Sequence, residues 1–264
     1  MRLGFIGCGN MASAMIAGIV EKKVVAPQEI MISALHEETK ERVKKAYGVQ
    51  VATSNSMVVE ESDIIVLAVK PQYYISVIQE IRNIVRADQI IVSIAPGKTM
   101  AWFAEQFEKP VKLVRTMPNT PAMVGEGMTG VCANCLVTPE ELEAVCNMLK
   151  GFGKVEVLGE HLMDVVVSVS GSSPAYVFLF IEAMADAAVA DGMPRAQAYE
   201  FAAQAILGSA KMVMETGMHP GALKDMVCSP GGSTIEAVRV LEDKGFRSAV
   251  IEAMKACANK SRTM

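Results

Sequence analysis

The feature that most constrains the fold is a glycine-rich segment directly after the first apolar run. Leu3–Ile6 leads into Gly7-Cys8-Gly9-Asn10-Met11-Ala12, and a helical pattern follows over residues 12–21. The first glycine permits a sharp turn, the second lets a pyrophosphate approach the backbone, and the small third residue lets the helix lie close to its strand. This order of strand, turn and helix predicts a dinucleotide-binding βαβ unit. A glycine turn without a ligand is the alternative.

Short apolar runs alternate with helical patterns through the first 159 residues. Most of the runs are continuously apolar, as expected of strands covered on both faces. This alternation predicts an α/β domain with an N-terminal Rossmann-type doubly wound sheet, mostly parallel, with right-handed crossovers. The predicted strands are residues 3–6, 30–32, 49–51, 64–69, 90–94, 111–115, 130–133 and 154–157, and the predicted helices are residues 12–21, 37–47, 74–85, 100–107 and 140–152.

The pattern changes after about residue 159, where strand signals largely disappear. Gly192-Met193-Pro194 separates two long helical patterns, with glycine after one helix and proline at the first turn of the next. We therefore predict a dinucleotide-binding Rossmann domain over residues 1–159 and an all-helical domain over residues 160–264. The predicted helices of the second domain are residues 174–190, 194–215, 222–227, 234–243 and 247–260. Residues 170–174 are predicted to cap the first of them.

Composition narrows the class of protein. Apolar residues make up 51% of the chain and charged residues 20%, which predicts that part of the apolar excess lies in a subunit interface. A net charge of −4 without a basic block argues against nucleic-acid binding. The longest uncharged stretch, residues 165–181, is shorter than the ~20 residues that a membrane-spanning helix needs, and the N-terminal apolar run ends too soon for a signal peptide.

The cysteines favour a reduced, cytoplasmic environment. Six are scattered along the chain, as expected of small apolar side chains that stay reduced. Cys132-x-x-Cys135 lacks a second pair at zinc spacing, so no metal site is predicted.

The ends of the second and third strands indicate which dinucleotide binds. NAD sites usually place Asp or Glu at the end of the second strand, where it accepts from the ribose hydroxyls. This chain has Ser33 there. A serine hydroxyl can donate to a 2′-phosphate that a carboxylate would repel, which favours NADP, although Glu37 and Glu38 slightly further on keep NAD open. Asn55 is either a second donor near the adenosine or a turn or cap residue.

The next strand ends complete the predicted crevice, because ligands of doubly wound sheets bind at the carboxyl ends of the strands. Ala68-Val69-Lys70-Pro71 and Ser93-Ile94-Ala95-Pro96-Gly97 are placed to contact ribose and nicotinamide, and Met117-Pro118-Asn119-Thr120-Pro121 belongs to the same rim. Lys70 is either a partner for a phosphate or a solvated lysine. The predicted cofactor-binding residues are Gly7, Gly9, Asn10, Met11, Ala12, Ser33, Asn55, Ala68, Val69, Lys70, Pro71, Ala95 and Gly97.

A second glycine-rich segment, Ser229-Pro230-Gly231-Gly232-Ser233-Thr234, precedes a helical pattern near the C-terminus. Paired glycines let a ligand approach the backbone, and the start of a helix offers unpaired N–H groups and partial positive charge. The segment suits a small carboxylate, with a Ser/Thr cap after a turn as the alternative. Together with the dinucleotide fingerprint, it predicts an enzyme that brings a small acid to a nicotinamide.

Five stretches, in order across nearly the whole chain, resemble the pyrroline-5-carboxylate reductase family. They are GCGNMASA at residues 7–14, AVKPQ at 68–72, RTMPNTPA at 115–122, SGSSPAY at 170–176 and LKDMVCSPGGSTIEAVRVLE at 223–242. The resemblance implies an NAD(P)H-dependent oxidoreductase that converts 1-pyrroline-5-carboxylate to L-proline, the last step of proline biosynthesis. It also implies a homo-oligomer in which the helical domains interleave to form a dimer, and five dimers often form a decamer.

The resemblance assigns substrate-binding roles to Val227, Ser229, Gly231, Gly232 and Thr234. The glycine amides and the serine hydroxyl would hold the carboxylate, and Val227 would line the pocket. Thr234, the predicted catalytic residue, would donate to the ring nitrogen. Ser33, Asn55 and the loops after the fourth and fifth strands match the family's cofactor contacts.

The histidines suggest no nucleophilic or metal-assisted chemistry, because His36, His161 and His219 fall in no such constellation. Reduction of a cyclic iminium needs mainly the orientation of the two reactants. Two alternatives stay open. A β-hydroxyacid dehydrogenase would carry a lysine on the first long helix of the second domain, where residues 174–191 contain none. A non-catalytic dinucleotide-binding protein would not need the carboxylate-shaped turn.

Overall fold

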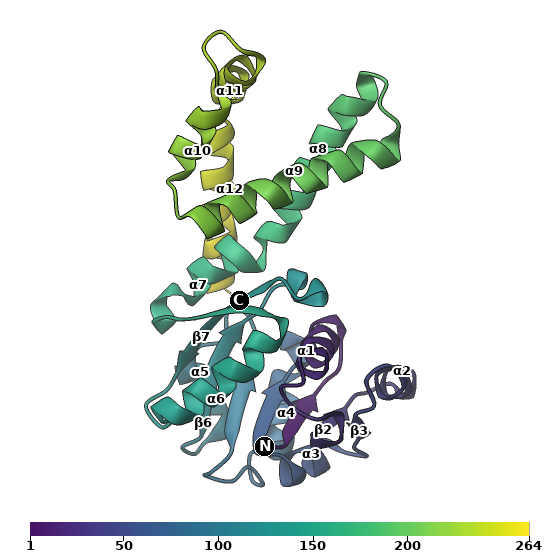
Figure 1. Ribbon diagram of the computed structural model, residues 1–264. Helices are drawn as coiled ribbons and strands as arrows, with labels where there is room; N and C mark the ends of the chain where they lie inside the picture. Colours follow the sequence, from purple (N-terminus) through teal and green to yellow (C-terminus); the bar gives the residue numbers. More distant parts are fainter. Residues whose placement is uncertain (264) are drawn as a thin grey trace. The chain divides into compact units, whose positions relative to one another are not determined.

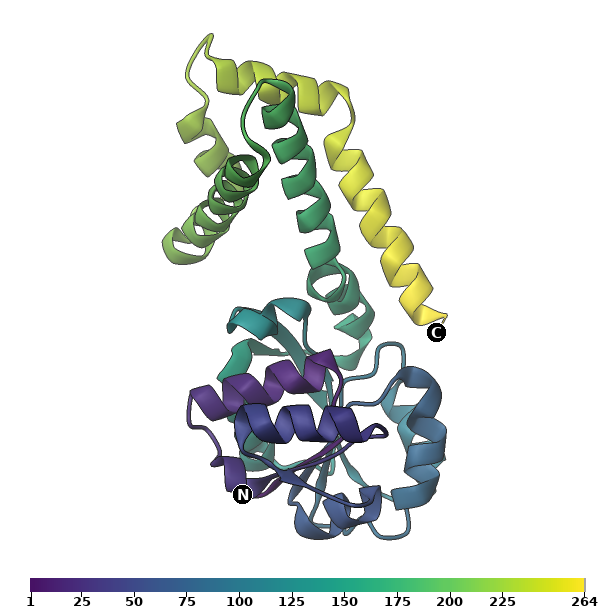
Figure 2. The ribbon, with the colours of Figure 1, turned by 90° about the vertical axis from the view of Figure 1, so that its right-hand side faces the viewer.

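A computed structural model describes residues 1–263 (Figures 1 and 2). Internal packing divides these residues into two compact units. The sheet unit comprises residues 1–172 together with the chain from Cys257 onward, and the helical unit is Ser173–Ala256. The chain therefore leaves the sheet unit once and returns to it.

Within residues 1–263, eight strands form one sheet in the order β3-β2-β1-β4-β5-β6-β7-β8. Neighbouring strands are parallel except β6 and β7, which are antiparallel. The strand order reverses between β1 and β4, the topological switch point at which such sheets bind ligands. The predicted Rossmann-type sheet is confirmed. The strands are β1 (Leu3–Ile6), β2 (Ile30–Ser33), β3 (Gln50–Val51), β4 (Ile64–Leu67), β5 (Ile90–Ser93), β6 (Lys112–Met117), β7 (Gly127–Ala133) and β8 (Gly153–Val157).

Helices cover both faces of this sheet and bury two apolar clusters. One cluster, which includes Phe5, Met15 and Phe152, lies under α1 (Asn10–Glu21), α2 (Glu37–Tyr47) and α6 (Pro139–Leu149). The other, which includes Tyr74 and Phe103, lies under α3 (Asn55–Glu61), α4 (Tyr74–Ile81) and α5 (Met100–Phe107). Figure 2 shows α1 and α2 side by side on their face. The short turns of this unit are η1 (Pro27–Glu29), η2 (Pro71–Tyr73), η3 (Thr120–Val124), η4 (Lys150–Phe152) and η5 (Glu160–Leu162).

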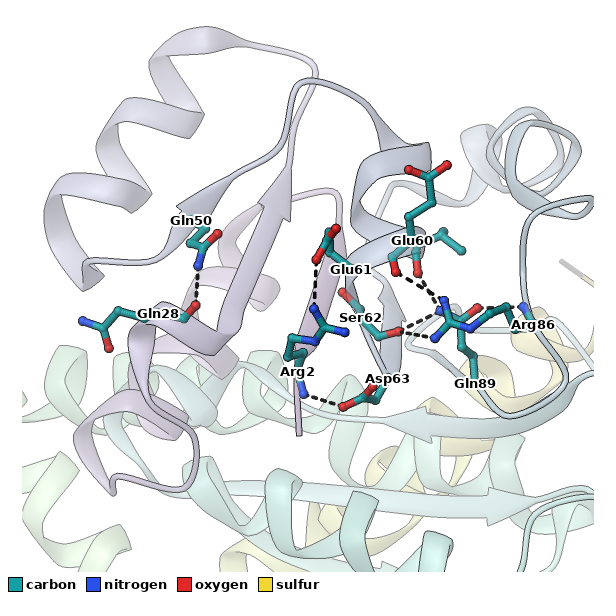
Figure 3. Close-up of polar contacts among 10 residues, drawn as sticks. Arg2, Gln28, Gln50, Glu60, Glu61, Ser62, Asp63, Arg86 and Gln89 are labelled. Atoms are coloured by element: carbon teal, nitrogen blue, oxygen red, sulfur yellow. Dashed lines mark hydrogen bonds and ion pairs between the residues drawn. The ribbon is translucent and has the colours of Figure 1, made fainter.

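Helix α3, which the sequence did not predict, is held at both ends. At its start, Ser54 Oγ accepts from the backbone N–H of Met57 at 3.1 Å. At its end, the buried Gln89 amide donates to the carbonyls of Val59 and Ser62, and Arg86 Nη1 donates to the Glu60 carbonyl at 3.2 Å (Figure 3). These side chains satisfy carbonyls that a helix end otherwise leaves unpaired. They fix a short helix whose first residue is Asn55.

The helical unit contains little buried apolar surface of its own. Its helices are α8 (Ser173–Ala190), α9 (Arg195–Thr216), α10 (Pro220–Val227), α11 (Ser233–Asp243) and most of α12 (Phe246–Arg262). Figure 1 shows α8 and α9 packed side by side as a hairpin. Among the described residues of this unit, the buried apolar side chains are only Ala185, Ala198 and Ala202. Leu179 and Phe201 are each 67% exposed.

The segment before α8 is a helix rather than the predicted capping loop. After α7 (Met163–Val166), residues Val167–Gly171 form a π-helical turn closed by Ser172 N–H on the Val167 carbonyl at 2.7 Å. Proline lacks a backbone N–H, so Pro174 cannot donate a helical hydrogen bond to the Ser170 carbonyl. Asn119 Nδ2 donates to that carbonyl instead, at 3.0 Å. A side chain from the loop after β6 therefore replaces the missing helical hydrogen bond.

This continuity lengthens the apolar helical stretch beyond what the sequence predicted. The run Glu160–Ala190 has 31 residues and is apolar enough, by length and composition alone, to cross a membrane. Only 17% of its most apolar window is buried inside this chain. Most of its apolar surface is thus left for something outside the chain to cover.

Candidate functional site

A cavity of about 710 Å³ opens at the carboxyl ends of β1, β2 and β4. This is the edge of the sheet unit where the strand order reverses. Seven of the predicted cofactor-binding residues line the cavity: Gly7, Gly9, Ser33, Asn55, Ala68, Val69 and Lys70.

The glycine turn shapes the cavity floor as a pyrophosphate site requires. Gly7 has φ +90°, a left-handed conformation, and a Cβ there would lie 2.8 Å from the Ala68 backbone. A Cβ at Gly9 would meet nothing within 4 Å, so the backbone at Gly9 faces open space in the cavity. Helix α1 begins immediately afterwards, without a side-chain cap or an acidic residue in its first turn. Its first N–H groups are thus available to an anion, and the residues fit a dinucleotide.

Six other predicted cofactor residues do not line the cavity. Asn10, Met11 and Ala12 form the first turn of α1, where Ala12 is buried against the core as the close helix–strand packing requires. Pro71 begins η2, while Ala95 and Gly97 follow β5. Direct contact between these residues and the cofactor stays a prediction.

A chain of polar side chains crosses the end of the cavity that is formed by β2, α3 and α4. Ser33, at the end of β2, donates through Oγ to Asn55 Oδ1 at 2.7 Å. Asn55 Nδ2 donates in turn to Glu80 Oε2 at 2.7 Å. Asn55, which the sequence left as a cofactor donor or a turn residue, is the first residue of α3 and lines the cavity.

Several lining residues were not predicted from the sequence. Tyr73, Ser76, Val77 and Glu80 line the cavity at spacings of three and four residues, which is one face of a helix. His36, Thr39 and Lys40 line it from the start of α2. The helical spacing of the first group was available in the sequence, but nothing there indicated which face of α4 turns toward a ligand.

Burial keeps the Tyr74 hydroxyl and the Cys8 thiol protonated at neutral pH. Tyr74 is fully buried and its hydroxyl donates to the Leu67 carbonyl at 2.5 Å, and burial raises the pKa of Tyr74 to about 12. Burial also raises the pKa of the Cys8 thiol to about 11, outweighing the opposite effects of Ser13 and Arg42. Cys8 is therefore a packing residue at neutral pH and not a thiolate nucleophile.

The second glycine segment forms a tight turn in the helical unit. Gly232 N–H donates to the Ser229 carbonyl at 3.1 Å, with Pro230 and Gly231 between them and Gly231 at φ +68°. This is the residue pattern of a type II turn, in which only glycine readily fits the third position. Gly232 then caps α11, which begins at Ser233.

The hydrogen bonds of this turn determine which of its backbone N–H groups are available to bind an anion. The Gly232 amide is engaged inside the turn. The N–H groups of the first turn of α11, where Thr234 lies, have no intrahelical partner. Ser229 and Val227 are exposed in this chain, with Val227 at 64%. The roles of these residues stay predictions.

The other candidate groups are dispersed. Among residues 1–263, no cluster of three His, Cys, Asp or Glu side chains could hold a metal ion. His219 accepts a hydrogen bond from the Gly221 N–H at the start of α10. Cys132 is buried in β7, whereas Cys135 is exposed.

Comparison with known proteins gives consistent matches along the chain. Residues 160–264 match the family model "Pyrroline-5-carboxylate reductase dimerisation", and residues 2–97 match "NADP oxidoreductase coenzyme F420-dependent". The chain is 54% identical to the pyrroline-5-carboxylate reductase of Escherichia coli (strain K12), over 100% of this chain and 98% of that protein.

Solved structures show the same similarity. A pyrroline-5-carboxylate reductase from Coxiella burnetii is 31% identical, with a TM-score of 0.92 over 99% of this chain and 97% of that chain. The Plasmodium falciparum pyrroline carboxylate reductase, solved with NADP bound, is 32% identical, with a TM-score of 0.91 over 100% and 97% of the two chains.

Proposed function

The chain belongs to the pyrroline-5-carboxylate reductase family, and from this we propose how its own residues perform the reaction. The protein is an oxidoreductase that reduces 1-pyrroline-5-carboxylate to L-proline with a nicotinamide dinucleotide, the last step of proline biosynthesis. The observation that carries the proposal is the cavity at the switch point, with its open backbone at Gly9 and the uncapped start of α1.

Within this site we propose NADPH as the preferred cofactor. Ser33 stands where NAD sites usually carry an acid, and His36, Thr39 and Lys40 line the same end of the cavity. His36, Thr39 and Lys40 offer donors to a 2′-phosphate, and Ser33 adds no negative charge that would repel it. The Plasmodium falciparum relative was solved with NADP bound. NADH stays the alternative.

For the substrate, we propose that the turn before α11 holds the carboxylate. The amides at the start of the helix and the Ser229 hydroxyl would donate to it, and Val227 would line the ring. The Thr234 hydroxyl would hydrogen-bond the ring nitrogen and fix the orientation of the imine carbon. The bound reduced nicotinamide supplies the hydride that converts C=N to C–N, while the nitrogen carries the proton. No side-chain nucleophile is required.

The chain self-associates through its helical region, as the match to the dimerisation family indicates. We further propose that the first domain is residues 1–159, and that residues 160–264 bind substrate and build a dimer, with a decamer as the larger form. The exposed apolar side chains of α8 and α9 support this assignment. We propose a cytoplasmic location, in keeping with free cysteines.

The activity is tested by following NADPH oxidation with 1-pyrroline-5-carboxylate, beside a control with 3-hydroxyisobutyrate and NADP⁺. We expect turnover in the first assay and none in the second. Turnover of the hydroxyacid would instead indicate a β-hydroxyacid dehydrogenase. Cofactor binding without either activity would indicate a non-catalytic protein.

The role of Thr234 is tested by Thr234→Ala. Loss of one hydrogen bond that orients the reacting ring should lower kcat about 10- to 100-fold, while calorimetry should give an unchanged NADPH affinity. Ser209→Ala on α9 removes an exposed hydroxyl from the same unit and serves as the control. A Thr234→Ala rate equal to that of the control would overturn the assignment.

A further inference from the structure

The hydrogen-bond chain Ser33–Asn55–Glu80 has a direction that matters for cofactor choice. All three residues line the cavity, and their side chains are joined by two bonds of 2.7 Å. Ser33 is 4% exposed, so its hydroxyl has few alternative partners. The state of this hydroxyl therefore depends on Asn55.

Glu80 fixes the orientation of the Asn55 amide. Carboxylate oxygens only accept hydrogen bonds, so the amide must turn its NH₂ group toward Glu80. Its carbonyl oxygen then faces Ser33, and that oxygen also only accepts. A reversed Asn55 would bring its oxygen against the carboxylate. The Ser33 proton is consequently committed to Asn55, and Ser33 offers the ligand only the lone pairs of its oxygen.

This state of Ser33 suits a hydroxyl better than a phosphate. A ribose 2′-hydroxyl can donate to the Ser33 oxygen, whereas a dianionic 2′-phosphate can only accept. To bind the phosphate, the Ser33 hydroxyl must rotate so that its O–H points away from Asn55. The Asn55 amide oxygen then loses that hydrogen bond. Glu80 also adds negative charge to the same cavity. The lysines that line the cavity are Lys40, which is paired with Glu37 at 2.6 Å, and Lys70.

We propose that Glu80 is a specificity-determining residue that lowers the preference for NADPH over NADH by holding Ser33, through Asn55, as an acceptor. The inference rests on the proposed function, because it concerns the same nucleotide site. In Glu80→Gln, the new amide can either accept from or donate to Asn55. Asn55 is then free to reverse, and Ser33 is free to donate to a 2′-phosphate.

The test is a calorimetric titration of the full-length protein, without substrate, using two nucleotide probes. Adenosine 2′,5′-bisphosphate and adenosine 5′-monophosphate differ only in the 2′-phosphate. Glu80→Gln should increase the affinity ratio in favour of the bisphosphate about tenfold, the value of one restored hydrogen bond to a charged group. Glu60→Gln removes a charge from α3, the helix that carries Asn55, and should leave the ratio unchanged.

A double-mutant cycle with Ser33→Ala separates hydrogen-bond direction from charge alone. If Glu80 acts through Ser33, the gain from Glu80→Gln shrinks severalfold when Ser33 is absent. An equal gain with and without Ser33, an equal shift in Glu60→Gln, or no shift in Glu80→Gln would each overturn the proposal. Glu80→Ala frees Asn55 in a second way and must show the same coupling to Ser33.

The outcome can be told apart from a failure of the proposed function. The probe affinities involve neither pyrroline-5-carboxylate nor turnover, so they report on Glu80 even if the reductase assay fails. Conversely, if the wild-type protein reduces the substrate while Glu80→Gln leaves the bisphosphate-to-monophosphate affinity ratio unchanged, the proposed function stands and only the inference about Glu80 is wrong.

Discussion

The two units of this chain differ in where their apolar side chains go. The sheet unit buries two clusters, one on each face of the sheet, whose largest members are fully inaccessible. The described residues of the helical unit bury three alanines and leave Leu179, Phe201 and Met226 each 67% exposed. Fully burying one such side chain contributes roughly 1.5–3 kcal/mol. The first unit therefore carries its own core, and the second must obtain one from another copy of the chain.

The largest effect should come from placing charges on the exposed apolar side chains of the helical unit. Leu179→Glu and Phe201→Glu should abolish self-association, because an interface cannot bury an unpaired carboxylate. Sedimentation velocity and far-UV circular dichroism would show monomers with reduced helix content.

Ile75→Glu on α4 is the matched control in the sheet unit, where Ile75 is 48% exposed. This variant should associate as the wild type does. If the two helical variants remained associated and folded at low protein concentration, the contrast between the units would be wrong.

An intermediate effect on stability is expected from breaking the buried hydrogen bonds of Gln89 inside the sheet unit. Gln89→Leu removes the amide donors to the Val59 and Ser62 carbonyls, which keep only the longer bonds from the Ser62 N–H at 3.4 Å and Arg86 Nη2 at 3.5 Å. It also takes away the Gln89 oxygen that accepts from the Arg86 N–H at 2.7 Å. The free energy of unfolding should fall by about 2–3 kcal/mol, as measured by urea titration, and the loss should not depend on protein concentration. Gln50→Leu alters an exposed amide on β3 and should cost less than about 0.5 kcal/mol (Figure 3).

The smallest effect concerns alkaline pH and the buried thiols of the sheet unit. Burial raises the pKa of Cys132 from 9.0 to about 11, with Arg115 opposing and Glu160 reinforcing the shift. Between these two values the unfolded chain loses its proton first, so stability is complete below pH 9 and declines as pH rises toward 11.

At pH 10 this decline amounts to about 1 kcal/mol for the single thiol. Cys132→Ala should make the unfolding free energy less dependent on pH between 8 and 10, whereas Cys135→Ala, at an exposed site, should not. Parallel pH profiles for wild type and Cys132→Ala would contradict the argument.

Much of the sheet unit could be predicted because its signals are local. Apolar runs, most of them continuous, predicted the strands, and the glycine turn and Ser33 lie at strand ends on one edge of the sheet, as predicted. What the sequence did not show depends on distant contacts. Helix α3 begins in Thr53-Ser54-Asn55-Ser56, which is typical of a turn, and its far end is capped by Gln89 and Arg86. The π-helical turn before α8 needs Asn119 for its Ser170 carbonyl.

The candidate site shows the same limit. Glycines and the serine at strand ends are visible because their chemistry is local. Glu80 lies in the last turn of α4, within the helix predicted over residues 74–85, and only the packing of α4 shows that it contacts Asn55. In the second glycine segment, the residue pattern predicted the turn. The bond of the Gly232 amide to the Ser229 carbonyl depends on the backbone angles of the turn, which the residue types alone do not determine.

The path of the chain between the units has a consequence for engineering. The sheet unit is interrupted after Ser172 and resumes at Cys257, and the thiol of Cys257 lies 3.3 Å from the hydroxyl of Ser172. The last turns of α12 are tied back by Ser261, which donates to Asp164 at 2.7 Å. The helical unit is thus a topological insertion whose two ends are adjacent. Excising residues 173–256 and bridging the ends with a few flexible residues would leave the whole nucleotide cavity on one short, continuous polypeptide.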